Sequence, residues 1–170
     1  DSVASQRFSD FECLVIDDGS SNDEYNNRLF LIKKYDSRFR AFRYQQNRGA
    51  AYARQFGLLQ SKGDIVAFID SDDTWARNYL STITILHDKY PLSPIVATSY
   101  SYPNQLVQHP VGSTATTISQ YTSLTLCFKT FFSCPTSSIK RSMIRIGFPC
   151  NLRLAEDLYF FFGNLILSKK

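Results

Sequence analysis

Short apolar or alternating segments and longer segments of helical periodicity follow one another along the first half of the chain. Three short segments bounded by turn-forming residues predict strands: residues 11–16, 39–44 and 65–69. Segments in which apolar residues recur every three or four positions predict helices at residues 22–35, 50–60 and 77–90. Strands that alternate with helices of this length favour an α/β, Rossmann-like fold with a mostly parallel sheet and helices on both faces.

The second half of the chain is less regular. Residues 95–102 predict another strand, and residues 103–121 are polar and rich in Ser and Thr, which is typical of a loop. The remaining pattern predicts an apolar, aromatic stretch at residues 124–132, a turn at 133–138, a short helix at 142–146 and a last helix from about residue 154. The length of 170 residues fits one domain with a sizeable core.

Two of the predicted strands end in carboxylates. The strand at 65–69 runs into Asp70, Asp72 and Asp73, and the strand at 11–16 runs into Asp17 and Asp18. Ligands of open α/β sheets collect at the carboxyl ends of the strands, and grouped oxygen ligands suit Mg²⁺ or Mn²⁺. An alternative of about equal weight for the cluster at 70–73 alone is that it caps the following helix. The second acidic strand end favours a metal-assisted nucleotide site.

Composition excludes several other classes of protein. Hydrophobic residues make up 44% and charged residues 20% of the chain, as in ordinary globular domains rather than disordered chains. The four cysteines and two histidines show no zinc-site spacing. The net charge of +4 is mild, and its basic residues around a helix end favour a solvated face over nucleic-acid binding. The apolar run at 158–167 is about half the length needed to span a bilayer.

Four pieces of the chain, taken in order, resemble one known family. They are Val15 to Ser20, Asn47 to Arg54, Phe68 to Asp73, and Ala155 to Asp157. Together they are similar to the family 2 glycosyltransferases, which are inverting enzymes of the GT-A fold. The resemblance covers most of the chain, and its ordered set of motifs is far more specific than any single piece.

The resemblance implies a role for each acidic strand end. Asp18, with Asp17 beside it, matches the carboxylate that meets the nucleotide base. Asp70 and Asp72 match the Asp-x-Asp motif, in which Asp72 is expected as the direct ligand of Mn²⁺ or Mg²⁺ and Asp70 lies nearer the ribose or a metal-bound water. Asp73 is a third candidate metal ligand.

The other two pieces imply a basic group and a catalytic base. Arg54 occupies the position of the family's Ala-Arg pair, where a guanidinium would approach the nucleotide or brace the aspartate loops. An exposed helix arginine is the alternative. Asp157 matches the base that removes a proton from the acceptor hydroxyl, and Glu156 would orient that base or the acceptor. An alternative, purely structural interpretation is that both carboxylates complement the dipole of the last helix at the N-terminus of that helix.

The chain also departs from the family pattern. Family members begin with an apolar strand that lies against the nucleotide, whereas residues 1–8 resemble the end of the following helix. We therefore expect that the first strand is missing, which would leave an unpaired edge within the sheet. Further acceptor-side helices are also expected beyond Asp157 in complete members. Both departures predict a truncated sequence.

The resemblance predicts a metal-dependent transferase of cell-envelope or polysaccharide biosynthesis. It would move a sugar from a nucleotide-sugar, a UDP-sugar being expected, to a glycan or lipid-linked acceptor. Residues 1–102 would bind the donor and residues 103–170 the acceptor, in the cytoplasm or peripherally at the inner face of the membrane. The alternatives are a non-catalytic nucleotide-sugar-binding module or inactive remnant, and a nucleotidyltransferase, which would need a glycine-rich basic loop that the sequence does not show.

Overall fold

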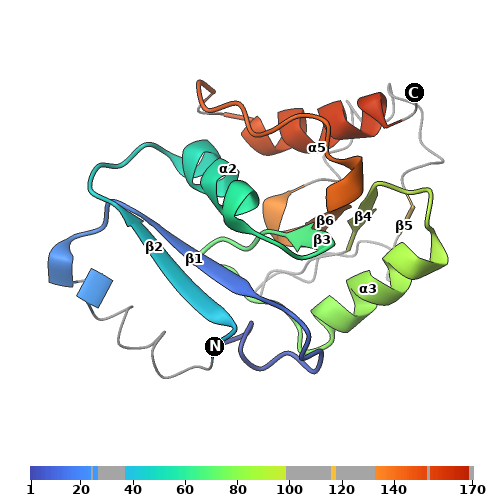
Figure 1. Cartoon of the computed structure of the whole chain (residues 1–170), viewed down its shortest axis with the longest axis horizontal. Coiled ribbons are helices and arrows are strands. Elements are labelled where there is room, and N and C mark those ends of the chain that lie inside the picture. Colours follow the sequence, from blue (N-terminus) through green and yellow to red (C-terminus); the bar gives the residue numbers. More distant parts are fainter. Residues whose placement is uncertain (24, 27–36, 99–115, 118–132, 153, 169–170) are drawn as a thin grey trace, which may run out of the picture.

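Two sheets and the helices around them make up the part of the chain that the computed structural model describes, residues 1–23, 25–26, 37–98, 116–117, 133–152 and 154–168. The strands run through the middle of the molecule in Figure 1, with helices α2 (Ala50–Gln60) and α5 (Glu156–Leu167) above them and helix α3 (Tyr79–Lys89) below. This layered α/β arrangement is the predicted fold class.

The first sheet is a parallel pair. Strand β1 (Cys13–Asp18) lies beside β2 (Phe39–Tyr44), in a register that pairs the first and last residues of each strand. The bounds of β2 and α2 are those predicted from the sequence, and β1 lies two residues further along the chain than predicted. Helix α2 packs against β1 closely enough that a Cβ built on Gly57 would lie 3.4 Å from the Ile16 side chain.

The second sheet has the strand order β3-β6-β4-β5, and all of its described pairings are antiparallel. Its strands are β3 (Ile65–Ala67), β4 (Ile95–Ala97), β5 (Thr116–Thr117) and β6 (Ser137–Lys140). Because β6 lies between β3 and β4 and opposes both, β3 and β4 run in the same direction. The parallel arrangement predicted for the early strands is therefore interrupted by one reversed strand.

The turn predicted at residues 133–138 is wrong at its end, because residues 137–140 form strand β6. Its first two residues, Ser137 and Ser138, are fully buried although they are polar, so they give no apolar pattern. Strand β5 likewise falls inside the predicted loop at 103–121, and a single 3-10 turn at Arg141–Met143 replaces the helix predicted at 142–146. The stretch at 124–132 and most of the helix predicted at 22–35 lie outside the described residues.

Helix α5 forms the centre of the larger core. Phe160 and Phe161 are completely buried, and the Phe160 ring stacks on Phe148 with ring centroids 4.1 Å apart. Ile95 of β4 and Ile139 of β6 are buried in the same cluster. Burial of each large apolar side chain contributes about 1.5–3 kcal/mol, so this aromatic packing holds the start of α5 against the second sheet.

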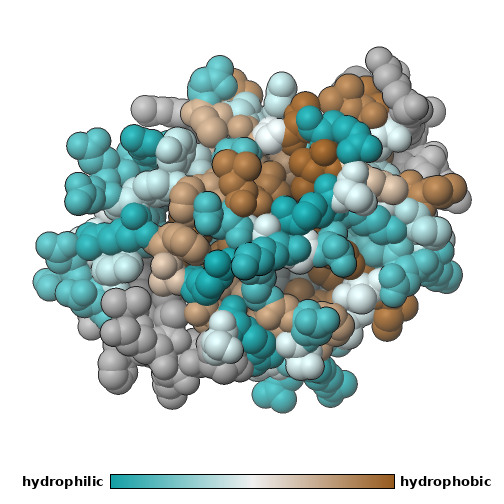
Figure 2. Space-filling model, viewed as in Figure 1, coloured by the Kyte–Doolittle hydropathy of each residue, from teal (hydrophilic) through white to brown (hydrophobic). Residues whose placement is uncertain are grey.

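Part of the apolar surface stays exposed near α5. Figure 2 shows apolar side chains gathered over the upper half of this face, with hydrophilic residues at both sides. Five exposed large apolar residues belong to α5 or the segment before it: Leu152, Leu154, Tyr159, Ile166 and Leu167. None of the helices within the described residues has the length and apolar character required to cross a membrane.

Candidate functional site

The candidate site lies where the acidic segments after β1 and β3 approach the N-terminal half of α2. Asp18 contacts the turn that begins α2, and Asp70 contacts Arg54 in the second turn of the same helix. Helix α5 adds its first residue, Glu156, to the same arginine. The end of β1, the segment after β3 and the N-terminal parts of α2 and α5 thus meet at one place.

Arg54 joins two of the predicted site residues. Its Nη2 lies 2.7 Å from Asp70 Oδ1, and its Nη1 lies 2.7 Å from Glu156 Oε1. The Arg54 and Glu156 side chains are each only 15% exposed, whereas Asp70 is 41% exposed. A guanidinium can serve both partners at once because its donors point along fixed directions. Arg54 is therefore not the isolated surface arginine of the alternative interpretation.

Asp18 fixes the turn before α2. Its Oδ1 accepts a hydrogen bond from the Arg48 amide at 2.8 Å, and its Oδ2 accepts one from the Gly49 amide at 2.7 Å. Gly49 has a φ of 92°, in the left-handed region that glycine adopts without steric cost. Each carboxylate oxygen keeps a second lone pair, so Asp18 can hold this turn and still accept a bond from a ligand.

Asp17 contacts the turn that follows β1. It is 5% exposed, its Oδ1 accepts hydrogen bonds from the Ser20 amide and hydroxyl, and its Oδ2 lies 3.5 Å from Arg43 Nε. This turn lies close against the segment before α2, since a Cβ on Gly19 would lie 2.7 Å from the Asn47 amide nitrogen. Asp17 therefore shapes the turn after β1 that carries Asp18.

The first turn of α5 holds Glu156 and Asp157. The preceding residue, Ala155, has a φ of 59°, which is rare for a residue with a side chain. Asp157 is half-buried and accepts a hydrogen bond from the Leu158 amide at 2.8 Å. Two carboxylates at a helix N-terminus are stabilised by the partial positive charge of the helix dipole.

Cys134 marks the point on which the charged residues converge. This buried thiol has its pKa raised, first by burial and further by the negative charges of Asp157, Asp70 and Glu156, while the positive charge of Arg54 opposes the rise. The interaction between charges is stronger in a protein interior than in water and decreases with distance. Asp157 therefore acts on the same thiol as Arg54 and Asp70, and no pattern in the sequence had linked these residues to Cys134.

Asp72 and Asp73 differ from the other site residues in being exposed. The pKa of Asp73 is raised by partial burial and by the charges of Asp72 and Asp70. Within the described ranges, no group of three or more His, Cys, Asp or Glu side chains is arranged to hold a metal ion. The donor set still fits a hard cation, because neighbouring carboxylates that repel one another are stabilised by Mg²⁺ or Mn²⁺.

Sequence patterns gave no role to two further residues, Trp75 and Gln55, that hold the segments around the site together. Trp75 stacks on Tyr79 and donates its indole N–H to the Pro135 carbonyl, which ties the acidic segment to the loop of Cys134. Gln55 accepts a hydrogen bond from the Phe148 amide at 2.7 Å and so joins α2 to the segment before α5. Sequence motifs do not reveal such residues, because their hydrogen-bond partners are backbone atoms of segments distant in sequence.

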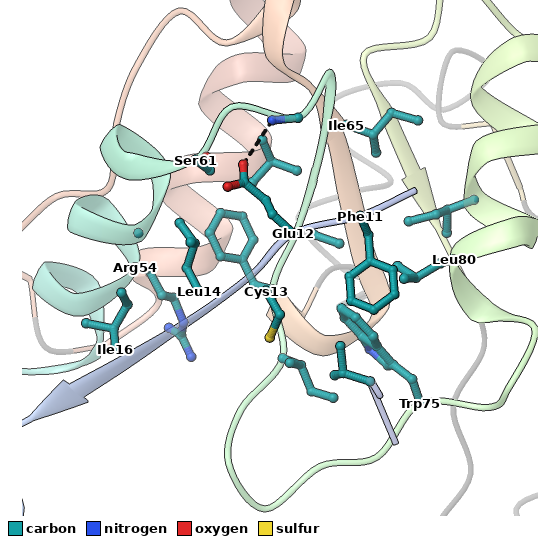
Figure 3. Close-up of a pocket in the computed structure, with 18 of the residues that line it drawn as sticks. Phe11, Glu12, Cys13, Leu14, Ile16, Arg54, Ser61, Ile65, Trp75 and Leu80 are labelled. Carbon is teal, nitrogen blue, oxygen red and sulfur yellow. Dashed lines mark hydrogen bonds between the residues drawn. The ribbon is translucent and has the colours of Figure 1, made fainter. Parts of the chain in front are cut away.

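A cavity of about 1230 Å³ leads away from the site along β1 and β3. Figure 3 shows Leu14, Ile16 and Arg54 on one side of it, and Ile65, Leu80 and Trp75 on the other. At the site it reaches Asp18 and Asp70, and at the opposite end it reaches Lys62 and Asp64. The candidate site thus lies at one end of a longer cavity.

Two relatives share about 80 residues with this chain. The UDP-Glc:alpha-D-GlcNAc-diphosphoundecaprenol beta-1,3-glucosyltransferase WfgD of Escherichia coli is 39% identical over 79 residues, which are 46% of this chain and 30% of the relative. The putative teichuronic acid biosynthesis glycosyltransferase TuaG of Bacillus subtilis is 37% identical over 79 residues, 46% of this chain and 31% of the relative. The matched part is less than a third of either relative.

Solved structures match nearly the whole chain. Staphylococcus aureus TarS 1-349 in complex with UDP gives a TM-score of 0.76 at 22% identity, over 97% of this chain and 49% of that one. The mannosyltransferase PcManGT of Pyrobaculum calidifontis in complex with GDP-Man and Mn²⁺ gives 0.69 at 16% identity, over 98% of this chain and 47% of that one. The likeness establishes the GT-A fold predicted from the sequence.

The family comparison covers the first three of the four sequence motifs. The family model for glycosyl transferase family 2 matches residues 1–147, which include both acidic strand ends and Arg54. The match extends over most of the chain, and the solved structures agree with it in fold. This chain therefore belongs to glycosyl transferase family 2.

Proposed function

We propose that the protein containing this chain transfers a sugar from a UDP-sugar to a glycan or lipid-linked acceptor, with inversion at the anomeric carbon. The observation that carries the proposal is the position of Arg54 between Asp70 and Glu156. It joins the acidic segment expected to bind the donor to the helix expected to supply the base. WfgD is named as a UDP-Glc transferase and TarS was solved with UDP, which supports a UDP-sugar donor.

The donor would bind at the carboxyl ends of β1 and β3. Asp18 would accept a hydrogen bond from the base or ribose while it holds the turn before α2. Asp17 would stabilise the turn after Asp18, because it accepts a hydrogen bond from the Ser20 amide. Asp70 would approach the ribose, and Arg54 keeps its carboxylate oriented.

The diphosphate would lie beside Asp72, with Asp70 and Asp73 as the other candidate ligands of Mn²⁺ or Mg²⁺. A divalent cation bound there would offset the charge that develops on the departing diphosphate. The exposure of Asp72 and Asp73 leaves them accessible to such an ion. Partial burial raises the pKa of Asp73 first, and the charges of Asp72 and Asp70 raise it further; a cation would compensate those charges.

Asp157 would act as the base. The acceptor oxygen would form a bond to the anomeric carbon while the proton of the acceptor hydroxyl passes to the Asp157 carboxylate. At the same time, the bond between the anomeric carbon and the diphosphate oxygen would break. The nucleoside diphosphate leaves on the opposite face, which inverts the configuration. Glu156, held by Arg54, would fix the first turn of α5 and so the direction of the Asp157 side chain.

A lipid-linked acceptor would place the protein at the inner face of the membrane. WfgD is named for a diphosphoundecaprenol acceptor, which supports this choice. Leu152, Leu154 and Tyr159 are exposed and lie near Asp157 in the sequence, so they would contact the lipid part of such an acceptor. Association with the membrane would then be peripheral.

Release of UDP from UDP-sugars in the presence of Mn²⁺ tests the proposal. Wild-type protein should turn over the donor, and Asp157→Asn should reduce turnover at least a hundredfold while UDP binding remains, because only the base is lost. Asp64→Asn is the matched control, since Asp64 is exposed at the opposite end of the cavity from Asp70. Binding of UDP without turnover on any acceptor would overturn the transferase and support a binding module.

A further inference from the structure

Two consecutive residues attach helix α2 to the part of the chain that carries the expected base. Arg54 binds Glu156 in the first turn of α5. The next residue, Gln55, accepts a hydrogen bond at its Oε1 from the Phe148 amide, at a distance of 2.7 Å. The second attachment involves no charged group, and it reaches the segment before α5 rather than the helix itself.

Gln55 packs against a glycine at a point that has no room for a side chain. A Cβ built on Gly147 would lie 2.9 Å from Cδ and Nε2 of Gln55, and closer still to Oε1. The backbone of Gly147 does not have a positive φ, so close packing and not conformation requires a glycine here. Gln55 and Gly147 are therefore a matched pair across the contact between α2 and the segment before α5.

Phe148 extends this contact to both sides of the candidate site. It is 5% exposed, and its ring stacks on Phe160 with centroids 4.1 Å apart and meets Phe68 edge-on at 5.1 Å. These are the geometries that aromatic pairs prefer. Phe160 follows Asp157 by about one helical turn, and Phe68 lies just before Asp70. A shift of Phe148 would therefore move the expected base relative to the acidic segment.

We infer that Gln55 is a positioning residue, which sets the distance between Asp157 and the acidic segment at residues 70–73 by holding Phe148 in place. The inference deepens the proposed transfer reaction and rests on it, because it concerns the alignment of the base with the bound donor. Gln55 acts through Phe148 and not on the reacting atoms. Misplacement of a reacting group by about 1 Å can reduce a rate about a hundredfold, so this remote hydrogen bond affects turnover.

The length of the side chain and its acceptor oxygen are both needed. An Asn would be one methylene shorter, by about 1.5 Å, which leaves the Phe148 amide beyond the limit of about 3.2 Å for a hydrogen bond. A Met has the length of Gln without a strong acceptor, whereas a Glu keeps both. Gln55→Asn and Gln55→Met should therefore lose the positioning, and Gln55→Glu should retain it.

Steady-state kinetics with a UDP-sugar, together with calorimetry of UDP and Mn²⁺, test the inference in the full-length protein that contains this chain. Gln55→Met and the milder Gln55→Asn should each lower kcat at least about tenfold, with the donor KM and the UDP affinity within about twofold of wild type, because only the base is displaced. Gln55→Glu should bring kcat back to within about threefold of wild type. Gln60→Met is the matched control, since Gln60 is exposed at the end of the same helix, and it should behave as wild type.

Gly147→Ala tests the packing from the other side of the contact. The added methyl group should displace Gln55 and lower kcat about as much as Gln55→Met. The double variant with Gln55→Asn should have no lower kcat than Gln55→Asn alone, because the shorter side chain leaves room for the methyl group and the two effects are then not additive.

Each other outcome counts against a specific claim. Wild-type kcat in Gln55→Met or Gln55→Asn, kcat and UDP affinity that fall together, or additive losses in the double variant would overturn the inference and leave the proposed transferase in place. A wild-type protein that binds UDP without turnover would overturn the proposed function, and the inference with it.

Discussion

Arg54 shows how a single residue organises this site. It is largely buried and holds Asp70 on one side and Glu156 on the other, 2.7 Å from each. Removing one member of a buried charged group leaves its partners uncompensated. The cost is reduced here because Asp70 is 41% exposed and can be solvated. Arg54 is therefore a structural link as well as a candidate ligand of the nucleotide.

Arg54→Met should lower the free energy of unfolding by about 2 kcal/mol, since it leaves Glu156 buried without its partner. Urea-induced unfolding measures this loss. Arg40→Met is the matched control, because Arg40 pairs with Glu12 at a more exposed position and should cost less than about 1 kcal/mol. Equal losses in the two variants would contradict the role assigned to Arg54.

His87 gives the molecule a specific dependence on pH. Burial is the main cause that lowers its pKa to about 4 from the ordinary 6.5; the charge of Lys140 lowers it further and that of Asp88 opposes the change. Between these two values the unfolded chain binds more protons at this position than the folded one. Stability from neutral His87 is therefore present above about pH 6.5 and is lost as the pH falls towards 4.

His87→Gln should remove this dependence. At pH 4.5 the wild-type protein should have lost about 2 to 3 kcal/mol more, relative to its value at pH 7, than the variant. The measurement is urea-induced unfolding of both proteins from pH 7 to pH 4.5, in which the titration of all other groups is shared. Parallel pH profiles would show that His87 is not held neutral in the fold.

At the scale of elements, α5 is fixed by one buried amide. Asn164 is completely buried; its Oδ1 accepts hydrogen bonds from the Arg145 and Ile146 amides, and its Nδ2 donates to the carbonyls of Ile146 and Phe160. These bonds join α5 to the segment that follows β6. The orientation of Glu156 and Asp157 at the start of the helix depends on that attachment.

Asn164→Ala should destabilise the protein by about 3 kcal/mol, because two backbone amides lose their acceptor in a buried position. Chemical denaturation provides the measurement. Asn151→Ala, at an exposed position, should change stability by less than about 0.5 kcal/mol. A small effect at Asn164 would mean that water or a rearranged backbone replaces its bonds.

Elements with a strong apolar pattern could be predicted from the sequence, and elements without one could not. Strand β2 and helix α2 have the predicted bounds because their apolar periodicity is complete within each segment. Strand β6 escaped prediction because Ser137 and Ser138 are buried through contacts with distant segments, such as the bond between Ser138 and His87. Burial of that kind is a property of the tertiary fold.

At the scale of the whole molecule, the fold class could be predicted from the sequence, and the contacts among the candidate site residues could not. Motif reading selected Asp70, Arg54 and Glu156 separately, and only the structure joins them. The convergence of charges on Cys134 had no counterpart in the sequence. The division into a donor-binding half, residues 1–102, and an acceptor-binding half, residues 103–170, stays a prediction.

We propose that the carboxyl ends of β1 and β3 bind a nucleoside diphosphate together with a divalent cation. Titration calorimetry of UDP into the protein, with and without Mn²⁺, measures this binding. We expect binding that needs Mn²⁺, that falls at least tenfold in Asp72→Asn, and that is unchanged in Asp64→Asn. Equal affinity with and without Mn²⁺, or in both variants, would contradict it.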